Sequence, residues 1–464
     1  MIQFGTGGWR AIIGDGFTKE NVQKLAQSVI PELNNKKAVV IGYDRRFLSD
    51  IASKWLAEVF IGNHVKVYFM NAAAPTPLVM FAAMKYDVDY SFSITASHNP
   101  AVYNGIKIFT KGGRDATEKV TQKLSQNLEH LAPVQSMDFD KGLKEGRVEI
   151  IQPKNEYIDH ILNFIDGDTI RKRNLRILVD TMHGVSKTTL SIILNTVRCD
   201  VDIINDRHDT LFGGKLPAPT SQTLNKLSDM VKENHYDLGI ATDGDADRIG
   251  IVDEYGNYIH PNLLISLIYQ YLLEEKGWKG PVVRNLSTTH LLDRIAKEHG
   301  EKCIETPVGF KHISSAMQQH QAIIGGESSG GLTIRGHING KDGILAASIL
   351  VEMIAVTNKT IHELVKDLYA RYGSCYNEER DYSFSNEKKN ALIHTLFELK
   401  EIPTMPLPIK TVSYLDGLKI VFEDDSWVSA RFSGTEPLLR IFAEAGSKET
   451  VDSLVKTMEG FLQL

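Results

Sequence analysis

Residues 237–248 read Asp-Leu-Gly-Ile-Ala-Thr-Asp-Gly-Asp-Ala-Asp-Arg, an apolar run followed by three aspartates at alternate positions. The apolar part is short and ends in a polar, sharply turning loop, as expected of a buried β-strand. In open α/β sheets, ligands bind beyond the carboxyl ends of the strands, where the loops converge. The segment therefore predicts a strand that carries an acidic loop into a binding site.

The same combination of strand and polar loop occurs at two other places in the chain. Residues 90–94 precede Thr95-Ala-Ser-His-Asn-Pro100, and residues 322–325 precede Gly326-Glu-Ser-Ser-Gly-Gly331. Each of the three loops is preceded by an apolar run, an amphipathic helix and a second apolar run, and the first runs lie at 38–42, 176–180 and 281–284. Strands that alternate with helices in this way indicate α/β units with largely parallel strands. Three units therefore each offer one loop to a shared site.

The periodicity changes after about Tyr372, where a polar stretch from Gly373 to Asn390 separates the α/β units from the rest of the chain. Beyond it, residues 418–422 and 427–430 flank a turn and predict a hairpin, and a helix is expected near 448–461. A chain of 464 residues is too long for one hydrophobic core, so three or four domains are expected. The last of them is predicted to be a small α+β domain.

The composition is that of an ordinary soluble globular protein, with 42% hydrophobic and 24% charged residues. The net charge is −6 without a long run of one sign, which argues against a general affinity for nucleic acid or anionic membranes. Cys199, Cys303 and Cys375 predict neither a disulfide framework nor a metal site, because they are far apart and odd in number. The N-terminus lacks the features of a signal peptide, and no apolar run approaches the about 20 residues of a membrane span. We expect a cytoplasmic protein.

The acidic loop is a candidate metal site. Asp243, Asp245 and Asp247 offer hard oxygen ligands, which suit Mg²⁺ or Ca²⁺ better than Zn²⁺. Three carboxylates this close repel one another, so a bound cation is the expected compensation. An EF-hand would use Glu254 as its twelfth residue, but its sixth residue is Arg248 in place of glycine, and strand-like residues flank the loop. The remaining alternative is a solvated acidic turn.

The other two loops, and a fourth near the C-terminus, carry groups suited to phosphate and sugar. Ser97 lies beside His98, and a serine that reacts at phosphorus needs a metal or another cation to neutralise the transferring oxygens. Glu327 and the serines after it can hydrogen-bond vicinal sugar hydroxyls. Arg431-Phe-Ser-Gly-Thr-Glu-Pro437 offers a guanidinium, two hydroxyls and turn amides, which together suit a phosphate. Taken singly, these loops could equally be an ST-turn or helix cap, a glycine-rich turn, and a basic residue at a strand end.

Taken together and in this order, the four loops resemble those of the α-D-phosphohexomutase superfamily, which includes phosphoglucomutase, phosphomannomutase and phosphoglucosamine mutase. The resemblance covers nearly the whole chain. It implies an α/β fold of four domains around a central cleft, in which three similar α/β domains with mixed sheets precede a C-terminal α+β domain. The expected domains carry the phosphoserine, metal-binding, sugar-binding and phosphate-binding loops in that order, at residues 1–145, 146–253, 254–370 and 371–464.

The resemblance also implies roles for individual residues. Ser97 would carry the phosphoryl group, and Ser97, Asp243, Asp245 and Asp247 would bind Mg²⁺. Further catalytic candidates are Arg10, His98 and Lys107. The substrate-binding candidates are Arg248, Lys311, His312, Glu327, Ser329, Arg431, Ser433, Gly434 and Thr435. Lys107 and Lys311 could equally be solvated surface lysines, and His98 could orient the serine without transferring a proton.

The activity implied is that of an isomerase, an intramolecular phosphotransferase that interconverts hexose 1-phosphate and hexose 6-phosphate. Mg²⁺ would be the cofactor, and a hexose 1,6-bisphosphate the intermediate and activator. Residues 306–312 are more similar to the phosphoglucomutase version of that loop, so glucose phosphates are favoured, with mannose phosphates or dual specificity as the close alternative. Two departures from the family pattern weaken a glucosamine assignment: Gly331 stands where glucosamine-type enzymes often have His, and Gly7 where many members have Asp or Ser.

Two functions of other classes remain open. A Mg²⁺-dependent sugar phosphatase would use the same serine and metal but release inorganic phosphate, and a catalytically silent protein would only bind sugar phosphates. The expected partners are small hexose phosphates, without nucleic acid or membrane, for a monomer or a homodimer. Because a phosphoserine open to water would hydrolyse, we expect the last domain to close over the cleft.

Overall fold

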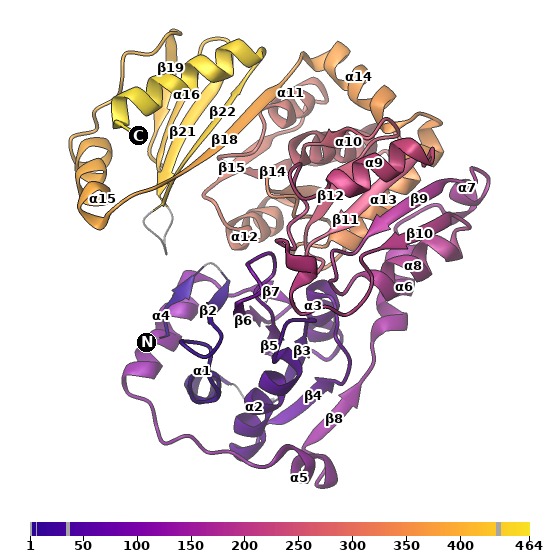
Figure 1. Cartoon of the computed structure of the whole chain (residues 1–464), viewed down its shortest axis with the longest axis vertical. Helices are drawn as coiled ribbons and strands as arrows, with labels where there is room; N and C mark the ends of the chain where they lie inside the picture. The colour runs from indigo at the N-terminus through magenta and orange to yellow at the C-terminus, as the bar shows by residue number, and fades with distance from the viewer. Residues whose placement is uncertain (1, 6, 34–37, 433–437) are drawn as a thin grey trace.

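Four β-sheets follow one another along the chain, and each forms the centre of one domain (Figure 1). The structure is a computed structural model and describes residues 2–5, 7–33, 38–432 and 438–464. The first three domains are α/β, and the fourth packs a helix against an antiparallel sheet. The predicted fold class, with mixed sheets in three domains and an α+β domain at the C-terminus, is confirmed.

The first sheet has the strand order β1-β2-β6-β5-β3-β4-β8, and β7 pairs with β6. The pairs among β5, β3, β4 and β8 are parallel, and all the others are antiparallel. The strands are β1 (Phe4–Gly5), β2 (Gly8–Ile12), β3 (Ala38–Tyr43), β4 (Lys66–Met70), β5 (Tyr90–Ile94), β6 (Tyr103–Thr110), β7 (Arg114–Asp115) and β8 (Val148–Ile151). The α-helices of this part are α1 (Lys19–Val29), α2 (Ser49–Gly62), α3 (Thr76–Lys85), α4 (Glu118–Glu129) and α5 (Phe139–Lys144). The sheet extends past residue 145, because β8 pairs with β4.

The second and third sheets repeat the central part of the first. In each unit the first strand lies between the second and the third, and an antiparallel strand follows, in the orders β4-β3-β5-β6, β10-β9-β11-β12 and β15-β14-β16-β17. The added strands are β9 (Arg176–Asp180), β10 (Asp200–Ile204), β11 (Leu238–Thr242), β12 (Ile249–Val252), β13 (Tyr258–Ile259), β14 (Val282–Asn285), β15 (Cys303–Thr306), β16 (Ile324–Gly326) and β17 (Leu332–Ile334). The helices are α6 (Lys154–Leu162), α7 (Gly167–Arg171), α8 (Lys187–Thr196), α9 (Asn225–Glu233), α10 (Pro261–Glu274), α11 (Leu291–Glu298), α12 (Phe310–His320), α13 (Gly343–Thr357) and α14 (Ile361–Tyr372). The predicted threefold repeat is thus present.

The third strand of each unit delivers one of the three predicted loops. Strands β5, β11 and β16 are buried along their whole length, which explains why their sequences are nearly continuous apolar or small runs. Each loop starts at the carboxyl end of its strand, where an α/β sheet places its ligands.

One apolar core extends through the first three domains, the first domain has a second core of its own around α1 and α2, and the fourth domain has a separate core. One buried cluster joins α3 of the first domain to α8 of the second and to α10 and α13 of the third. Helix α13 is buried continuously from Gly343 to Ala355, because it lies at the centre of this shared core. Within the described residues, no single helix has both the length and the apolar character of a membrane span; only α13 and α14 counted together do, and they are bent by 80° relative to each other.

The fourth domain is an antiparallel sheet of order β18-β22-β21-β20-β19 (Figure 1). Its elements are β18 (Tyr376–Ser383), α15 (Asn386–Ile393), a π-helical turn (His394–Glu398), β19 (Ile409–Ser413), β20 (Leu418–Phe422), β21 (Trp427–Phe432), β22 (Leu438–Ala445) and α16 (Lys448–Leu462). Strands β20 and β21 form the predicted hairpin, and α16 is the predicted C-terminal helix. The polar stretch 373–390 differs from expectation because it contains β18, which is an edge strand and therefore tolerates charged residues on its solvent side.

Candidate active site

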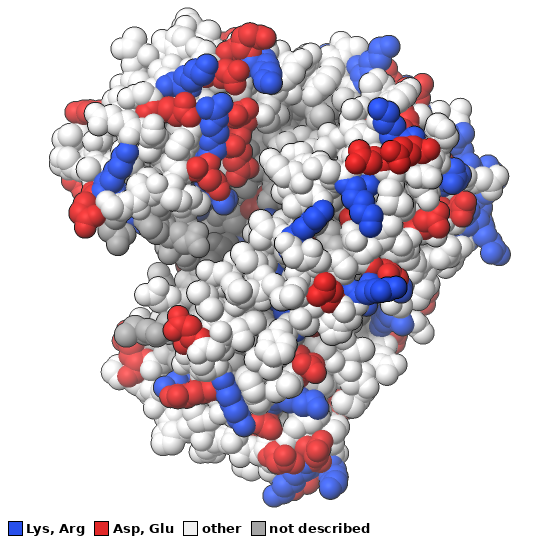
Figure 2. Space-filling view, in the orientation of Figure 1, with Lys and Arg blue, Asp and Glu red and all other residues white. Residues whose placement is uncertain are grey.

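The loops after β5, β11 and β16 meet strands of the fourth domain around one cavity of about 360 Å³. Figure 2 shows a hollow between the fourth domain and the first, on a face where both signs of charge are interspersed. Eight of the residues predicted from the sequence line the cavity: Arg10, His98, Lys107, Arg248, Lys311, Glu327, Ser329 and Arg431. His312 does not line it, and Ser433, Gly434 and Thr435 lie outside the described residues.

The structure brings Ser97 directly against the acidic loop. The Ser97 hydroxyl donates a hydrogen bond to Asp243 Oδ2 at 2.7 Å, although the two residues are 146 positions apart. His98 Nδ1 lies 3.3 Å from the same hydroxyl. The charge of Arg248, together with burial, lowers the pKa of His98 well below its ordinary value, so its imidazole is neutral near pH 7.

The backbone around Ser97 is strained and firmly held. Ser97 has φ +53°, in the left-handed region that costs a non-glycine residue about 1–2 kcal/mol. Its N–H donates to Thr95 Oγ1 at 2.8 Å. The buried guanidinium of Arg46 donates to the carbonyl oxygens of Ser97 and Asn99, each at 2.6 Å. These bonds fix the backbone of the loop that carries the hydroxyl.

Asp243, Asp245 and Asp247 are buried and form a compact oxygen cluster. One carboxylate oxygen from each lies within 4.8 Å of the other two. Lys107 Nζ donates to Asp245 Oδ2 at 2.6 Å and to Asp247 Oδ2 at 2.5 Å. Asp245 Oδ1 and Asp247 Oδ1 remain buried without a hydrogen-bond partner within the part of the chain that is described.

The electrostatics of this cluster fit a hard divalent cation. Burial, reinforced by the charges of the other two aspartates, raises the pKa of Asp243 well above its ordinary value. Burial would also raise the pKa of Asp247, but the charges of Lys107 and Lys341 outweigh it and lower the pKa. Two orphaned carboxylate oxygens and a carboxyl that resists ionisation both indicate missing positive charge. Mg²⁺ takes oxygen ligands of this kind, so the residues present suit it.

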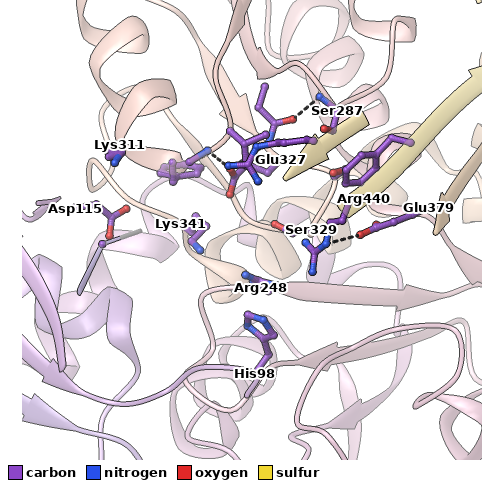
Figure 3. Close-up of a pocket in the computed structure, with 18 of the residues that line it drawn as sticks. His98, Asp115, Arg248, Ser287, Lys311, Glu327, Ser329, Lys341, Glu379 and Arg440 are labelled. Carbon is purple, nitrogen blue, oxygen red and sulfur yellow. Dashed lines mark hydrogen bonds and ion pairs between the residues drawn. The ribbon is translucent and has the colours of Figure 1, made fainter. Parts of the chain in front are cut away.

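The loop after β16 supplies polar groups to the opposite wall (Figure 3). Glu327 Oε1 accepts hydrogen bonds from Asn285 Nδ2 and from the Gly309 N–H, both at 3.2 Å. The hydroxyls of Ser287 and Ser329 are buried and have no hydrogen-bond partner among the described residues. Unpaired buried hydroxyls in a polar cavity are suited to a polar ligand.

Most cationic side chains of the cavity are already paired with an acid. Lys311 Nζ lies 2.6 Å from Glu118 Oε1, which reaches across from α4 of the first domain. Lys341 Nζ lies 3.3 Å from Asp247 Oδ2. Arg431 Nε donates to Asp416 Oδ2 at 2.9 Å. A bound phosphate would therefore share or exchange these partners.

Asp416 also connects the fourth domain to the third. The same oxygen that accepts from Arg431 accepts from the Val308 N–H at 2.9 Å. Val308 belongs to the loop between β15 and α12, which lines the cavity. One carboxylate thus fixes Arg431 relative to that loop.

Several residues that line the cavity were not predicted from the sequence. They include Asp115, Asn285, Ser287, Lys341, Glu379 and Arg440. For Lys341 the sequence indicates only its place just before a helix, because Asp342 caps α13 by accepting from two backbone N–H groups and Asp before a long apolar run marks a helix start. The others come from strands and short turns without a distinctive pattern.

Family models for all four domains of phosphoglucomutase/phosphomannomutase match the chain. Domain I matches residues 1–134, domain II 155–256, domain III 260–372 and the C-terminal domain 391–460. The first three matches are to models described as α/β/α domains.

Similar proteins carry several names within this group. A phosphoglucomutase/phosphomannomutase of Thermococcus kodakarensis is 32% identical over 452 residues, which cover 96% of this chain and 95% of that protein. A protein of Pyrococcus furiosus named a probable phosphoglucosamine mutase is 31% identical over 460 residues, with 99% and 97% covered. A crystal structure from Thermus thermophilus, with a provisional phosphomannomutase name, superimposes with a TM-score of 0.87 at 28% identity and covers 100% of this chain and 99% of its own.

Proposed function

Because the chain belongs to the α-D-phosphohexomutase superfamily and is an isomerase of the intramolecular phosphotransferase type, we propose that it interconverts hexose 1-phosphate and hexose 6-phosphate, with glucose phosphates favoured. The observation that carries the proposal is the 2.7 Å hydrogen bond from the Ser97 hydroxyl to Asp243 within the acidic cluster. A phosphoryl group on Ser97 would lie beside the three carboxylates that a cation needs.

In this proposal Ser97 carries the phosphoryl group, and Ser97, Asp243, Asp245 and Asp247 hold Mg²⁺. When bound, Mg²⁺ would neutralise charge on the transferring oxygens. Lys107 lies against two of the aspartates and adds positive charge on the cavity side. Because His98 is neutral, it can accept a proton from a hydroxyl near Ser97 or orient the serine.

The other residues predicted from the sequence would bind and orient the sugar phosphate. Arg431, with Ser433, Gly434 and Thr435, binds the phosphate that is not being transferred, and Glu327 and Ser329 bind ring hydroxyls. Arg10, Arg248 and Lys311 supply positive charge for the other phosphate. His312 remains a prediction of the resemblance; it lies 3.7 Å from Glu118, outside the cavity lining.

The reaction passes through a hexose 1,6-bisphosphate. This intermediate reorients within the cavity before Ser97 takes back the other phosphate. The bisphosphate has to be retained, and water has to be kept from the phosphoserine. The contact of Asp416 with both Val308 and Arg431 supports closure of the fourth domain for this purpose. Mannose phosphates, or both sugars, are the alternative substrates, because similar proteins carry both names. A cytoplasmic location accords with three free cysteines.

A panel of glucose, mannose and glucosamine 1-phosphates tests the proposal, each assayed with Mg²⁺ and its 1,6-bisphosphate. Phosphorus NMR separates the 6-phosphate product from inorganic phosphate, so a phosphatase is recognised by phosphate release without an isomer. Ser97→Ala should abolish isomerisation, whereas Ser191→Ala on α8 should not. Intact-mass measurement after incubation with the bisphosphate should find a phosphoryl group on the wild type but not on Ser97→Ala. Full activity of Ser97→Ala would refute the role of this serine.

A further inference from the structure

One carboxylate in the cavity has no partner among the side chains that the structure describes. Of the acidic side chains that line it, Glu327 accepts two hydrogen bonds and Glu379 lies 3.8 Å from Arg440. Asp115 has neither a hydrogen bond nor an ion pair from its side chain within residues 2–5, 7–33, 38–432 and 438–464. In Figure 3 it faces the same open space as Lys311 and Lys341, without a dashed line to any drawn residue. This half-buried carboxylate has lost part of its hydration, which a hydrogen-bond donor on a ligand would replace.

Its backbone places this carboxylate firmly. Asp115 belongs to β7, whose partner β6 also carries Lys107, and Asp115 lies opposite Phe109 in the register. Asp115 therefore comes from the same sheet that carries the Ser97 loop at the end of β5. Its position is fixed by the sheet and does not depend on a long flexible side chain.

Gly7 leaves the carboxylate open to the cavity. A Cβ atom at Gly7 would lie 3.4 Å from Asp115 Oδ1, so a larger side chain there would extend over the carboxylate. Gly7 itself lines the cavity and has φ +79°, which disfavours any other residue. The glycine at this position thus keeps Asp115 accessible.

The chemistry of the surroundings limits what Asp115 can bind. A phosphate oxygen would be repelled by the carboxylate, and the cavity offers Arg10, Arg248 and Arg431 for phosphate. Burial raises the pKa of Asp115 above its ordinary value, although the charges of Lys341 and Lys107 act in the opposite direction. An ionised or protonated carboxyl can hydrogen-bond a hydroxyl in either state. A ring hydroxyl is therefore the matching group on a sugar phosphate.

We propose that Asp115 hydrogen-bonds a ring hydroxyl of the hexose phosphate, as a specificity-determining residue that the first domain contributes opposite Glu327 and Ser329 of the third. This inference rests on the proposed function. With it, carboxylates from two domains hold the sugar ring, while the cations hold its phosphates. Asp115 then affects the selectivity between sugars more than the affinity for phosphate.

Deoxy substrates test the assignment atom by atom. Wild type, Asp115→Ala and Asp115→Asn are assayed from glucose 1-phosphate and from its 2-deoxy, 3-deoxy and 4-deoxy counterparts, with kcat/KM taken from phosphorus NMR. For glucose 1-phosphate, Asp115→Ala should lower kcat/KM by about 10- to 100-fold, the value of a hydrogen bond to a charged acceptor, and Asp115→Asn by less, because its amide oxygen still accepts. For one of the three deoxy sugars the loss should vanish, since that substrate lacks the hydroxyl concerned.

The controls separate this inference from the function on which it depends. Wild-type turnover of glucose 1-phosphate tests the proposed function alone. Asp15→Ala, in the same domain but outside the cavity lining, should behave as wild type with all four sugars, and thermal melts verify that each variant is folded. An equal loss for glucose 1-phosphate and all three deoxy sugars, or no loss for any of them, would overturn the proposal.

Discussion

Replacing Asp416 should weaken the positioning of Arg431 without touching the reacting atoms. Its Oδ2 accepts hydrogen bonds from the Val308 N–H and from Arg431 Nε, both at 2.9 Å. The two charged side chains of the ion pair are 21% and 26% exposed, so water can partly replace the lost contacts. Loss of both bonds in Asp416→Ala should then cost about 1–2 kcal/mol, which is about 5- to 30-fold in kcat/KM. Asp416→Asn keeps an acceptor oxygen and should lose about 2- to 5-fold.

The assay is the conversion of glucose 1-phosphate at several concentrations of added glucose 1,6-bisphosphate. If Asp416 holds the closed arrangement, its variants should release the bisphosphate more often and need more of it for full activity. A general loss of stability would not produce that dependence. Asp425→Asn, a carboxylate of the same domain that pairs only with the exposed Lys410 among described side chains, is the matched control. Wild-type kcat/KM and bisphosphate dependence in Asp416→Ala would refute the reasoning.

Three further predictions concern the metal, the sugar loop and a buried lysine. Chelation of divalent metal should abolish turnover, and added Mg²⁺ should restore it. Asp245→Asn should raise the Mg²⁺ concentration that gives the half-maximal rate. Full activity in the presence of chelator would contradict the metal site. Gly331→His should lower kcat/KM at least about tenfold, because a Cβ there would lie 2.2 Å from Lys341 Cδ and displace that lysine from the cavity; unchanged kinetics would show that Lys341 is dispensable. Burial, reinforced by the charge of Arg284, lowers the pKa of Lys419 from 10.5 to about 8. Between these pH values the unfolded chain binds more protons than the folded one, so the free energy of unfolding should rise with pH, by up to about 3 kcal/mol. In urea unfolding, Lys419→Met should lack this rise, and parallel pH profiles would disprove the assignment.

The architecture was predictable because its signals are local. Each of the three α/β units has its apolar runs and its loop in one continuous segment, and the hairpin of β20 and β21 is indicated by a polar turn between two apolar runs. Strand β18 was not predicted, because an edge strand with residues such as Glu378 and Asp381 pairs through its backbone and needs few apolar side chains.

The sequence pointed to cavity residues most clearly where they stand in one loop, although Arg10 and Lys107, which lie on strands, also line the cavity. Ser97 and the aspartates stand in recognisable turns, whereas Asp115, Lys341 and Asp416 acquire their places from the packing of distant elements. His312 illustrates the opposite case. It follows Lys311 directly in the sequence, but both lie on α12, where neighbouring residues point about 100° apart, and only Lys311 faces the cavity.

Because the fourth domain has its own apolar core, the two halves of the active site belong to separately packed parts of the molecule. Ser97 and the acidic loop are mounted on the fused body of three domains, while Arg431 is mounted on a module with its own apolar interior. The fourth domain contacts the rest of the molecule through hydrogen bonds such as those from Lys419 to Leu286 and Glu305, and its apolar core is separate. Substitutions inside that core are therefore expected to change how the sugar phosphate is anchored more than they change the geometry of Ser97 and the acidic loop.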